Sequence, residues 1–245
     1  MSIITLKNIG KDFSEDNKLL TVLKDINLEI KMGEFFIFLG PSGSGKSTLL
    51  RIMSGLEKQF EGHLALDPSV NKSDFSFVFQ QFALLPWMTI FENVEIGLLA
   101  RNIPKNERHL TVMTELKRLG LEKFALSYPK ELSGGMKQRV GIARAIVTKP
   151  KIIFMDEPFS ALDSFTAEEL RQEILNIWQV TQTTMVMVTH LISEALELGD
   201  KIAVLTPRPG KIAAILQNPL PRPRQKRSKG FFVMEDKLTN LIKLS

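Results

Sequence analysis

The chain has 245 residues, of which 44% are apolar and 24% are charged, and its formal net charge is +5. This length suits one large domain or two small ones, and the absence of cysteine excludes a disulfide framework and a thiolate zinc site. The first residues lack a signal-peptide pattern, and no run approaches the ~18 apolar residues of a membrane-spanning helix. We therefore expect a chain that is soluble by its own sequence and reaches a membrane only through a partner.

The first part of the chain predicts strands followed by one helix. Residues 3–9 and 22–30 alternate apolar and polar side chains, which is typical of half-buried antiparallel strands. Residues 35–39 are wholly apolar, as in a strand that is covered on both faces. A loop of glycines and serines follows, and residues 47–55 resume with helical spacing of their apolar side chains.

The middle of the chain predicts helices alone, at residues 90–101 and 106–119. Because no run typical of a buried strand lies between them, we interpret residues 88–145 as a helical subdomain inserted into an α/β core. Beyond this insertion, apolar strands alternate with helices, which indicates a mostly parallel sheet with helices on its faces. The strands are expected at 151–156, 184–189 and 201–205, and the helices at 135–148, 164–181 and 191–199.

The fold class expected is therefore α/β, as one domain over residues 1–245, with an N-terminal antiparallel β part. Its core would comprise residues 1–87 and 146–220. Prolines after Thr206 limit regular structure there to short strands or turns. The basic residues of 221–245 could bind nucleic acid or anionic lipid, or form a solvated tail. Because the rest of the chain is only weakly charged, we favour a solvated tail without a role, and no nucleic-acid partner.

A glycine-rich segment between the strand at 35–39 and the next helix carries the first chemical motif. Residues 40–47 match the phosphate-loop pattern G-x-x-x-x-G-K-[ST]. Its backbone N–H groups can turn toward phosphates, and the helix N-terminus adds a favourable dipole. Lys46 would reach the β- and γ-phosphates, and the Ser47 hydroxyl would bind Mg²⁺. The predicted nucleotide-binding residues here are Gly40, Pro41, Ser42, Gly43, Ser44, Gly45, Lys46, Ser47 and Thr48.

Two carboxylates end the predicted strand at 151–156. An acid at the carboxyl end of a strand beside a phosphate loop can hold Mg²⁺ through its water shell, which is the role expected of Asp156. Glu157 would polarise the attacking water. The alternative is a strand that simply ends in exposed acids.

Residues Leu132 to Arg139 read Leu-Ser-Gly-Gly-Met-Lys-Gln-Arg. A serine and two glycines ahead of a helix form a second phosphate-binding N-terminus, with Ser133 as the N-cap. The segment resembles the signature sequence of the ATP-binding-cassette (ABC) family, Leu-Ser-Gly-Gly-Gln, with Met136 in place of the glutamine. The resemblance extends in chain order over residues 1 to about 215 and implies a nucleotide-hydrolysing phosphate-loop core.

The resemblance also implies roles for residues that are weak indicators alone. Phe13 would stack on adenine, and Gln80 would contact Mg²⁺ and link to the helical subdomain. Asp163 would lie in a loop that crosses to a second subunit, and His190 would hydrogen-bond the γ-phosphate. The predicted catalytic residues are Lys46, Glu157 and His190, and the predicted Mg²⁺ ligands are Ser47, Gln80 and Asp156.

In the ABC family two cassettes pair head to tail, so that ATP on one subunit is covered by Ser133, Gly134 and Gly135 of the other. The resemblance thus implies a homodimer that binds ATP and Mg²⁺ at the cytoplasmic face of the cell membrane, beneath two transmembrane permease subunits. The permease would dock a short helix near Gln80. The apolar segment 82–87 would line that groove, or it would be an ordinary buried segment.

Two further segments, Leu84-Leu-Pro-Trp87 and Arg208-Pro-Gly210, resemble the nitrate, sulfonate and taurine importer ATPases. This resemblance implies a solute importer that works with an extracytoplasmic solute-binding protein. Two alternatives stay open. One is the ATPase of an exporter or lipid-handling system. The other is a soluble ABC ATPase of DNA repair or chromosome structure, although such enzymes usually carry a long coiled coil ahead of the signature segment.

Overall fold

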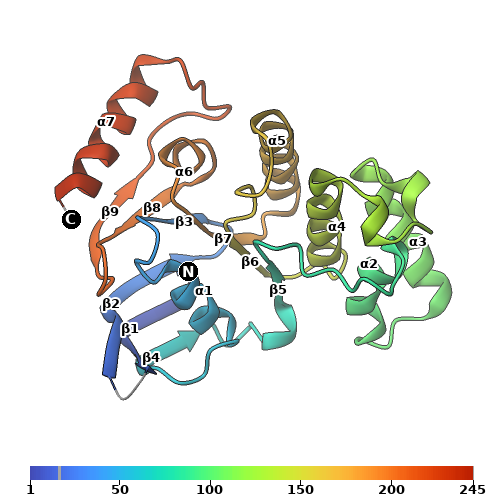
Figure 1. Ribbon diagram of the computed structural model, residues 1–245, viewed down its shortest axis with the longest axis horizontal. Helices are drawn as coiled ribbons and strands as arrows, with labels where there is room; N and C mark the ends of the chain where they lie inside the picture. The colour runs from blue at the N-terminus through green and yellow to red at the C-terminus, as the bar shows by residue number, and fades with distance from the viewer. Residues whose placement is uncertain (16–17, 245) are drawn as a thin grey trace. The chain divides into compact units, whose positions relative to one another are not determined.

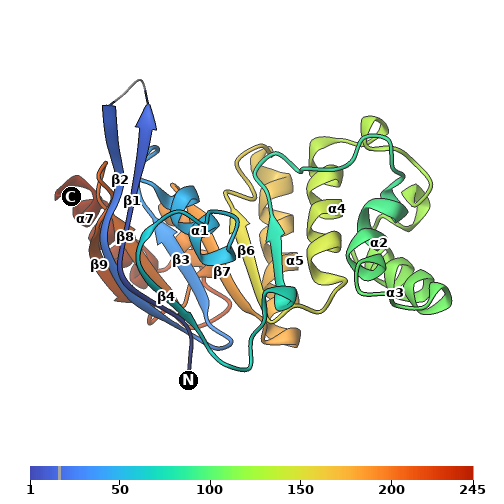
Figure 2. The same ribbon diagram turned by 90° about the horizontal axis from the view of Figure 1, so that it is seen from below.

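The computed structural model describes residues 1–15 and 18–244 of the chain. It divides into two compact units, unit 1 with Met1–Lys72 and Gln182–Ser245, and unit 2 with Ser73–Thr181. Figures 1 and 2 show the elements of both units from two sides. Residues 16, 17 and 245, which belong to the predicted core and tail, lie outside the described residues.

Unit 1 contains an antiparallel sheet of three strands in the order β2-β1-β4. Its strands are β1 (Ser2–Glu15), β2 (Lys18–Lys31) and β4 (Glu61–Leu66). Alternation of side chains places the apolar residues on one face, so that Ile4 of β1 pairs with Ile30 of β2 and all their atoms are buried. The two antiparallel strands predicted near the N-terminus are confirmed, and β4 is an addition that the sequence reading did not include.

The second sheet of unit 1 has the order β7-β3-β8-β9. β3 (Phe35–Leu39) lies between β7 (Thr184–Thr189) and β8 (Lys201–Leu205) and is parallel to both, while β9 (Ile212–Gln217) is antiparallel to β8. All five side chains of β3 are buried, as its apolar run predicts. Helix α1 (Lys46–Ser54) lies between the two sheets of this unit (Figures 1 and 2).

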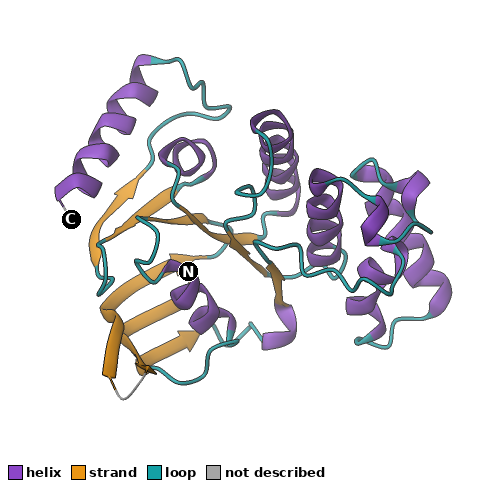
Figure 3. Cartoon of the chain, in the orientation of Figure 1, coloured by secondary structure: helices purple, strands orange, loops and turns teal. Residues whose placement is uncertain are grey.

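Unit 2 pairs β5 (Phe75–Val78) in parallel with β6 (Ile152–Asp156). The chain between these strands forms helices and loops only, as Figure 3 shows for residues 90–146. The helices of the unit are α2 (Ile90–Leu99), α3 (Lys105–Arg118), α4 (Gly134–Ile146) and α5 (Ser164–Thr181). The predicted α/β class with an inserted helical segment is thus confirmed.

Side-chain contacts fix the helices of unit 2 to one another. The half-buried pair Arg108–Glu95, at 2.7 Å between Nε and Oε1, connects α3 to α2. The guanidinium of Arg139 on α4 lies 3.1 Å from Glu169 and 3.3 Å from Glu173, both on α5. No helix formed by the described residues is long and apolar enough to cross a membrane.

The segment after Thr206 departs from the sequence-based expectation. It forms a 16-residue helix, α7 (Lys229–Leu244), which packs against α6 (Ile192–Leu198) and β8 in unit 1 (Figure 1). Phe231, Met234 and Leu238 of α7 are buried, at the i, i+3, i+7 spacing of one helix face. The interpretation of 221–245 as a solvated tail with only short strands or turns is therefore wrong.

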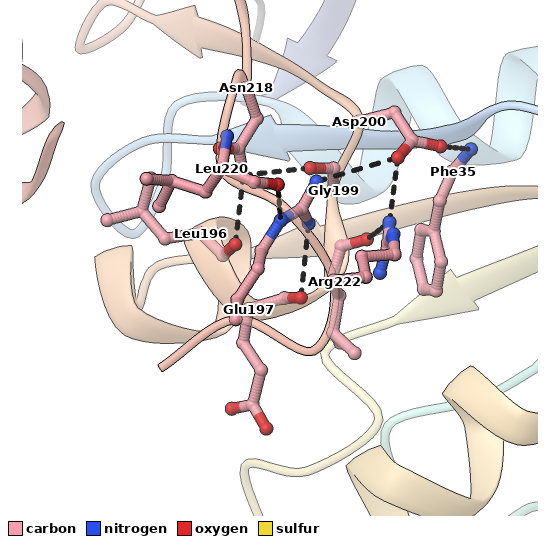
Figure 4. A network of polar contacts seen from close by, with 10 residues as sticks. Phe35, Leu196, Glu197, Gly199, Asp200, Asn218, Leu220 and Arg222 are labelled. Atoms are coloured by element: carbon pink, nitrogen blue, oxygen red, sulfur yellow. Dashed lines mark hydrogen bonds and ion pairs between the residues drawn. The ribbon is translucent and has the colours of Figure 1, made fainter. Parts of the chain in front are cut away.

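Two of the basic residues of this segment are paired and largely buried. The Arg222 Nη2 donates to Asp200 Oδ1 at 2.8 Å, and the Arg224 Nη2 lies 3.6 Å from the same oxygen (Figure 4). The other oxygen of Asp200 accepts from the N–H of Phe35, the first residue of β3. Burial, together with the charge of Arg222, lowers the pKa of Arg224 to about 10, so Arg224 stays protonated at neutral pH. Asp200 thus joins the C-terminal segment to the central sheet of unit 1.

The substitution Asp200→Ala should lower the free energy of unfolding by about 3 kcal/mol, because it leaves two buried guanidinium groups without their carboxylate. Urea unfolding followed by circular dichroism measures this change. Asp236→Ala removes an exposed acid on α7 and should change the unfolding free energy by less than about 0.5 kcal/mol. Equal effects of the two substitutions would contradict the assignment of Asp200.

Candidate nucleotide-binding site

The phosphate loop of unit 1, Gly40–Ser47, follows β3 and leads into α1. Gly43 has a φ of 80° and Gly45 a φ of 90°, in the left-handed region that favours glycine. A Cβ at Gly45 would lie 2.7 Å from Cδ2 of Leu23, so a larger residue is excluded there by contact as well. The loop conformation that its glycines predict is therefore imposed by both backbone dihedrals and packing.

The N-terminus of α1 is suited to an anion. Gly45 is its N-cap, no side chain caps the helix, and the first turn contains no acid. The first N–H groups of a helix have no partner within the helix, and its dipole favours negative charge. The Lys46 ammonium lies at the loop and donates to the carbonyl oxygens of Gly40, at 2.9 Å, and Pro41, at 2.8 Å. This set of groups fits the phosphates of a nucleotide.

The segment Arg208–Gly210, between β8 and β9, contacts the phosphate loop at Gly43 and Ser44. The N–H of Gly210 donates to the carbonyl of Val22 at 2.9 Å, and the Gly210 carbonyl accepts from Lys24. A Cβ at Gly210 would overlap the carbonyl oxygen of Ser44, so the backbones of the loop and of this segment lie in close contact at that point. Arg208 donates to the carbonyl of Gly43 at 3.4 Å. Sequence reasoning used this segment only as a mark of kinship and missed its contact with the loop.

Unit 1 also contains Phe13 and His190. Phe13 lies on β1 with 39% of its surface exposed, and the ammonium of Lys11 lies 4.5 Å from the centre of its ring. An exposed aromatic ring of this kind can stack on a base. His190 directly follows β7 and is exposed.

In unit 2 the structure brings together three segments that the sequence analysis singled out. Gln80 follows β5, and its Nε2 donates to the Ser160 hydroxyl at 3.2 Å. The Ser160 hydroxyl donates in turn to the carbonyl oxygen of Glu157 at 3.0 Å. Glu157 has a φ of 42°, an uncommon conformation for a residue with a side chain, and such residues concentrate at functional sites. Asp156, at the end of β6, is 4% exposed.

The signature segment of unit 2 begins α4. Ser133 is the N-cap, and its hydroxyl oxygen accepts from the N–H of Met136 at 3.3 Å, as the sequence predicts. The first turn contains no acid, and Ser133 and Gly134 are exposed. A Cβ at Gly135 would lie 2.5 Å from Cγ2 of Thr166, which explains why glycine is needed there. The helix end therefore presents backbone N–H groups at the surface of unit 2.

Asp163 has a local structural role. Its Oδ1 accepts from the N–H groups of Thr166, at 3.0 Å, and Phe165, at 3.1 Å, and so caps the start of α5. The hydrogen bonds from Thr166 and Phe165 lower the pKa of this carboxyl. The end of the loop from Glu157 to Asp163 is thereby fixed to the first turn of α5.

A groove of about 460 Å³ lies in unit 2 beside β5, lined by Phe75, Phe77, Phe79, Ala83, Arg101 and Arg144 among others. The Arg144 guanidinium donates to the carbonyls of Ala83, at 2.7 Å, and Phe82, at 3.1 Å, and burial lowers its pKa. It thereby holds the start of the segment 82–87. Trp87, at the end of that segment, is 70% exposed, so the segment is not an ordinary buried one.

The comparisons with known proteins agree with this geometry. The family model described as "ABC transporter" matches residues 23–160. An uncharacterised ABC transporter ATP-binding protein of Methanocaldococcus jannaschii is 44% identical over 98% of this chain and 91% of its own length. The aliphatic sulfonates import ATP-binding protein SsuB of Bacillus cereus is 41% identical over 93% of this chain and 91% of its own length.

A third relative, the nitrate import ATP-binding protein NrtD of a Synechocystis strain, is 38% identical over 98% of this chain and 95% of its own length. Among solved structures, a dimeric ATP-binding cassette in a post-hydrolysis state with ADP and Pi superposes with a TM-score of 0.77. It is 37% identical and covers 88% of this chain and 98% of its own. The chain therefore belongs to the ABC transporter family, as an ATPase similar to those of sulfonate and nitrate importers.

Proposed function

We propose that this chain is the ATP-hydrolysing subunit of a membrane importer for nitrate, sulfonate, taurine or a related small solute. The observation that carries the proposal is the pair of helix N-termini, those of α1 and α4, that lack acids in their first turns and have glycine at the N-cap or in the first turn. Both are suited to phosphate, and they belong to the two motifs that pair across an ABC dimer. The similarity to SsuB and NrtD supports the kind of solute.

In this proposal ATP binds to unit 1 through its phosphates and its base. The N–H groups of residues 42–48 and the Lys46 ammonium would hold the β- and γ-phosphates, where Lys46 would exchange the carbonyls of Gly40 and Pro41 for phosphate oxygens. Phe13 would stack on the adenine ring with the face that Lys11 does not cover.

Hydrolysis would depend on the acids at the end of β6. Glu157 would accept a hydrogen bond from the attacking water and polarise it, and His190 would donate to the γ-phosphate. The Glu157 backbone is held in its unusual conformation by Ser160, which Gln80 contacts in turn. Ser47, Gln80 and Asp156 would hold Mg²⁺, whose preference for oxygen ligands they meet. When bound, Mg²⁺ supplies positive charge that offsets the charge of the phosphates.

Two copies of the chain would share each ATP. The exposed Ser133 and Gly134 and the half-buried Gly135 of one copy would cover the nucleotide bound to the phosphate loop of the other. ATP would then be part of the interface, and loss of its γ-phosphate would let the two copies separate. The bound nucleotide would thus shift the chain between two states. The similar solved cassettes are described as dimeric, which supports this arrangement.

Transport would require two permease subunits and an extracytoplasmic solute-binding protein. We assign the permease contact to the groove beside β5, which residues of the helical subdomain (88–145) help to line, and to the exposed Trp87, which directly precedes that subdomain in the chain. The chain would then lie at the cytoplasmic face of the membrane. The core of the cassette would be residues 1–87 and 146–220.

The variant Glu157→Gln should accumulate as an ATP-bound dimer with ATP hydrolysis reduced by at least about 100-fold, because the amide cannot polarise the attacking water. Gel filtration with ATP and Mg²⁺, together with phosphate release, measures both effects. Glu122→Gln, an exposed acid of unit 2, serves as the matched control and should remain active.

The double variant Glu157→Gln, Ser133→Arg distinguishes a shared site from a site within one chain. It should bind ATP as a monomer and fail to dimerise, because the arginine fills the space of the partner's nucleotide. Loss of ATP binding itself would refute the shared site. A Glu157→Gln variant that stays monomeric with ATP and Mg²⁺, or hydrolyses normally, would refute the assignment of Glu157 as the residue that polarises the water.

The variant Gly210→Ala should weaken ATP binding by at least about 10-fold, because its methyl group displaces Ser44 and the phosphate loop. Titration with a fluorescent ATP analogue measures the affinity. Gly141→Ala is the matched control, since a methyl group there meets no atom closer than 3.7 Å. Unchanged affinity in a folded Gly210→Ala protein would show that Arg208–Gly210 does not position the loop.

The solute is tested on the assembled transporter. The chain, purified with its membrane subunits and reconstituted with the solute-binding protein, should show ATPase activity that sulfonates, taurine or nitrate stimulates. Stimulation by a lipid or by a solute on the ATP side would instead favour an exporter or lipid-handling system. Isolation with DNA-associated proteins and without any permease would favour a soluble ABC ATPase.

A further inference from the structure

The loop that carries His190 has a polar anchor that the proposed function does not use. β7 ends at Thr189 and α6 begins at Ile192, so only His190 and Leu191 connect them. The Thr189 hydroxyl donates to Oε2 of Glu194, in the first turn of α6, at 2.6 Å. The Thr189 hydroxyl oxygen also accepts from the N–H of Leu191 at 3.1 Å. The hydroxyl of Thr189 thus contacts the residue that follows His190, and His190 lies between the two.

Both partners of this hydrogen bond are out of contact with water. Thr189 is 1% exposed and Glu194 is 5% exposed. Burial of a carboxylate is costly unless it accepts strong hydrogen bonds, and a hydrogen bond to a charged oxygen is stronger than a neutral one. The exposed imidazole of His190 therefore follows directly on a rigid, buried contact.

Helix α6 is itself a fixed anchor, although seven residues form too short a helix to be stable alone. At its C-terminal end the carbonyls, which have no partner within the helix, accept from side chains of the C-terminal segment (Figure 4). Asn218 Nδ2 donates to the carbonyls of Leu196 and Gly199, at 2.9 and 3.0 Å. Arg222 donates to Leu198, and Arg224 donates to Glu197. The positive charges of the two arginines also favour this end of the helix dipole.

We propose that Thr189 and Glu194 are positioning residues for ATP hydrolysis, which hold the His190 loop at the geometry required for contact with the γ-phosphate. The inference rests on the proposed function, because it assumes that His190 acts on bound ATP. Catalytic groups lose much of their effect when they shift by about 1 Å, so a looser loop should slow hydrolysis without weakening nucleotide binding.

The strand β7 offers a matched control at its other end. Thr184, like Thr189, is 1% exposed, and its hydroxyl accepts from one backbone N–H, that of Gly33, at 2.9 Å. Thr184→Val and Thr189→Val therefore make the same chemical change in the same strand, at equal burial. Only Thr189 contacts the segment that carries His190.

The experiment measures kcat and KM for ATP, and the urea midpoint, for the full chain and its variants. Thr189→Val should lower kcat by about 10- to 100-fold with KM within about twofold of the original. Thr189→Ser keeps the hydroxyl and should retain at least about half of kcat. Thr184→Val should lower the urea midpoint by about as much as Thr189→Val does, and should leave kcat within about twofold of the original.

Glu194→Ala should reproduce the loss of Thr189→Val, and the double variant should be no slower than either single variant, because both remove one interaction. Glu194→Gln keeps an acceptor oxygen and should be milder. The proposal is overturned if Thr189→Val retains its kcat, or if Thr184→Val loses as much kcat as Thr189→Val does.

Two reference measurements separate this inference from the proposed function. If the unmodified chain hydrolyses no ATP, or if His190→Ala hydrolyses it normally, the assignment of His190 fails first. If the chain is active, His190→Ala is inactive and Thr189→Val is unaffected, the positioning inference alone is wrong.

Discussion

The need for glycine at three positions in and beside the phosphate loop is the constraint on which unit 1 depends. Gly40, Gly45 and Gly210 each lie where a Cβ would strike a neighbouring atom, and the neighbours come from β2, from the end of β8 and from the loop itself. These close approaches bring the antiparallel sheet, the parallel sheet and α1 to the same few backbone atoms. Since packed interiors do not deform continuously, the loop has one conformation for as long as both sheets keep their places.

The sequence was most informative where a residue's role depends on its neighbours in the chain. The apolar runs of β3 and of residues 185–188 in β7 predicted strands covered on both faces, and the phosphate loop was identified from its spacing between a strand and a helix. Ser133 was predicted as an N-cap and is one. β4 and β5 were missed because they are short and only half-buried, so neither shows a clear alternation of apolar and polar residues.

The features that sequence reasoning could not supply depend on contacts between distant parts of the chain. The support that Gly210 gives to Ser44 joins residues more than 160 positions apart, and no local pattern marks it. Likewise, no residue near Arg222 and Arg224 in the sequence indicates that both pair with Asp200 in the folded chain. The helix α7 is different, since Phe231, Met234 and Leu238 have helical spacing in the sequence. There the prolines ahead of the helix wrongly predicted only short strands or turns for the residues that follow them.

The left-handed backbone of Glu157 has a consequence for how this protein balances stability against activity. A non-glycine residue in that conformation costs about 1–2 kcal/mol relative to glycine, which adopts it freely. A chain selected for thermal endurance alone would place glycine at this position. Because a carboxylate is retained there, the free energy of the folded state is slightly higher than it would be with glycine. Screens for more heat-resistant variants should therefore select substitutions at position 157, and these would inactivate the enzyme.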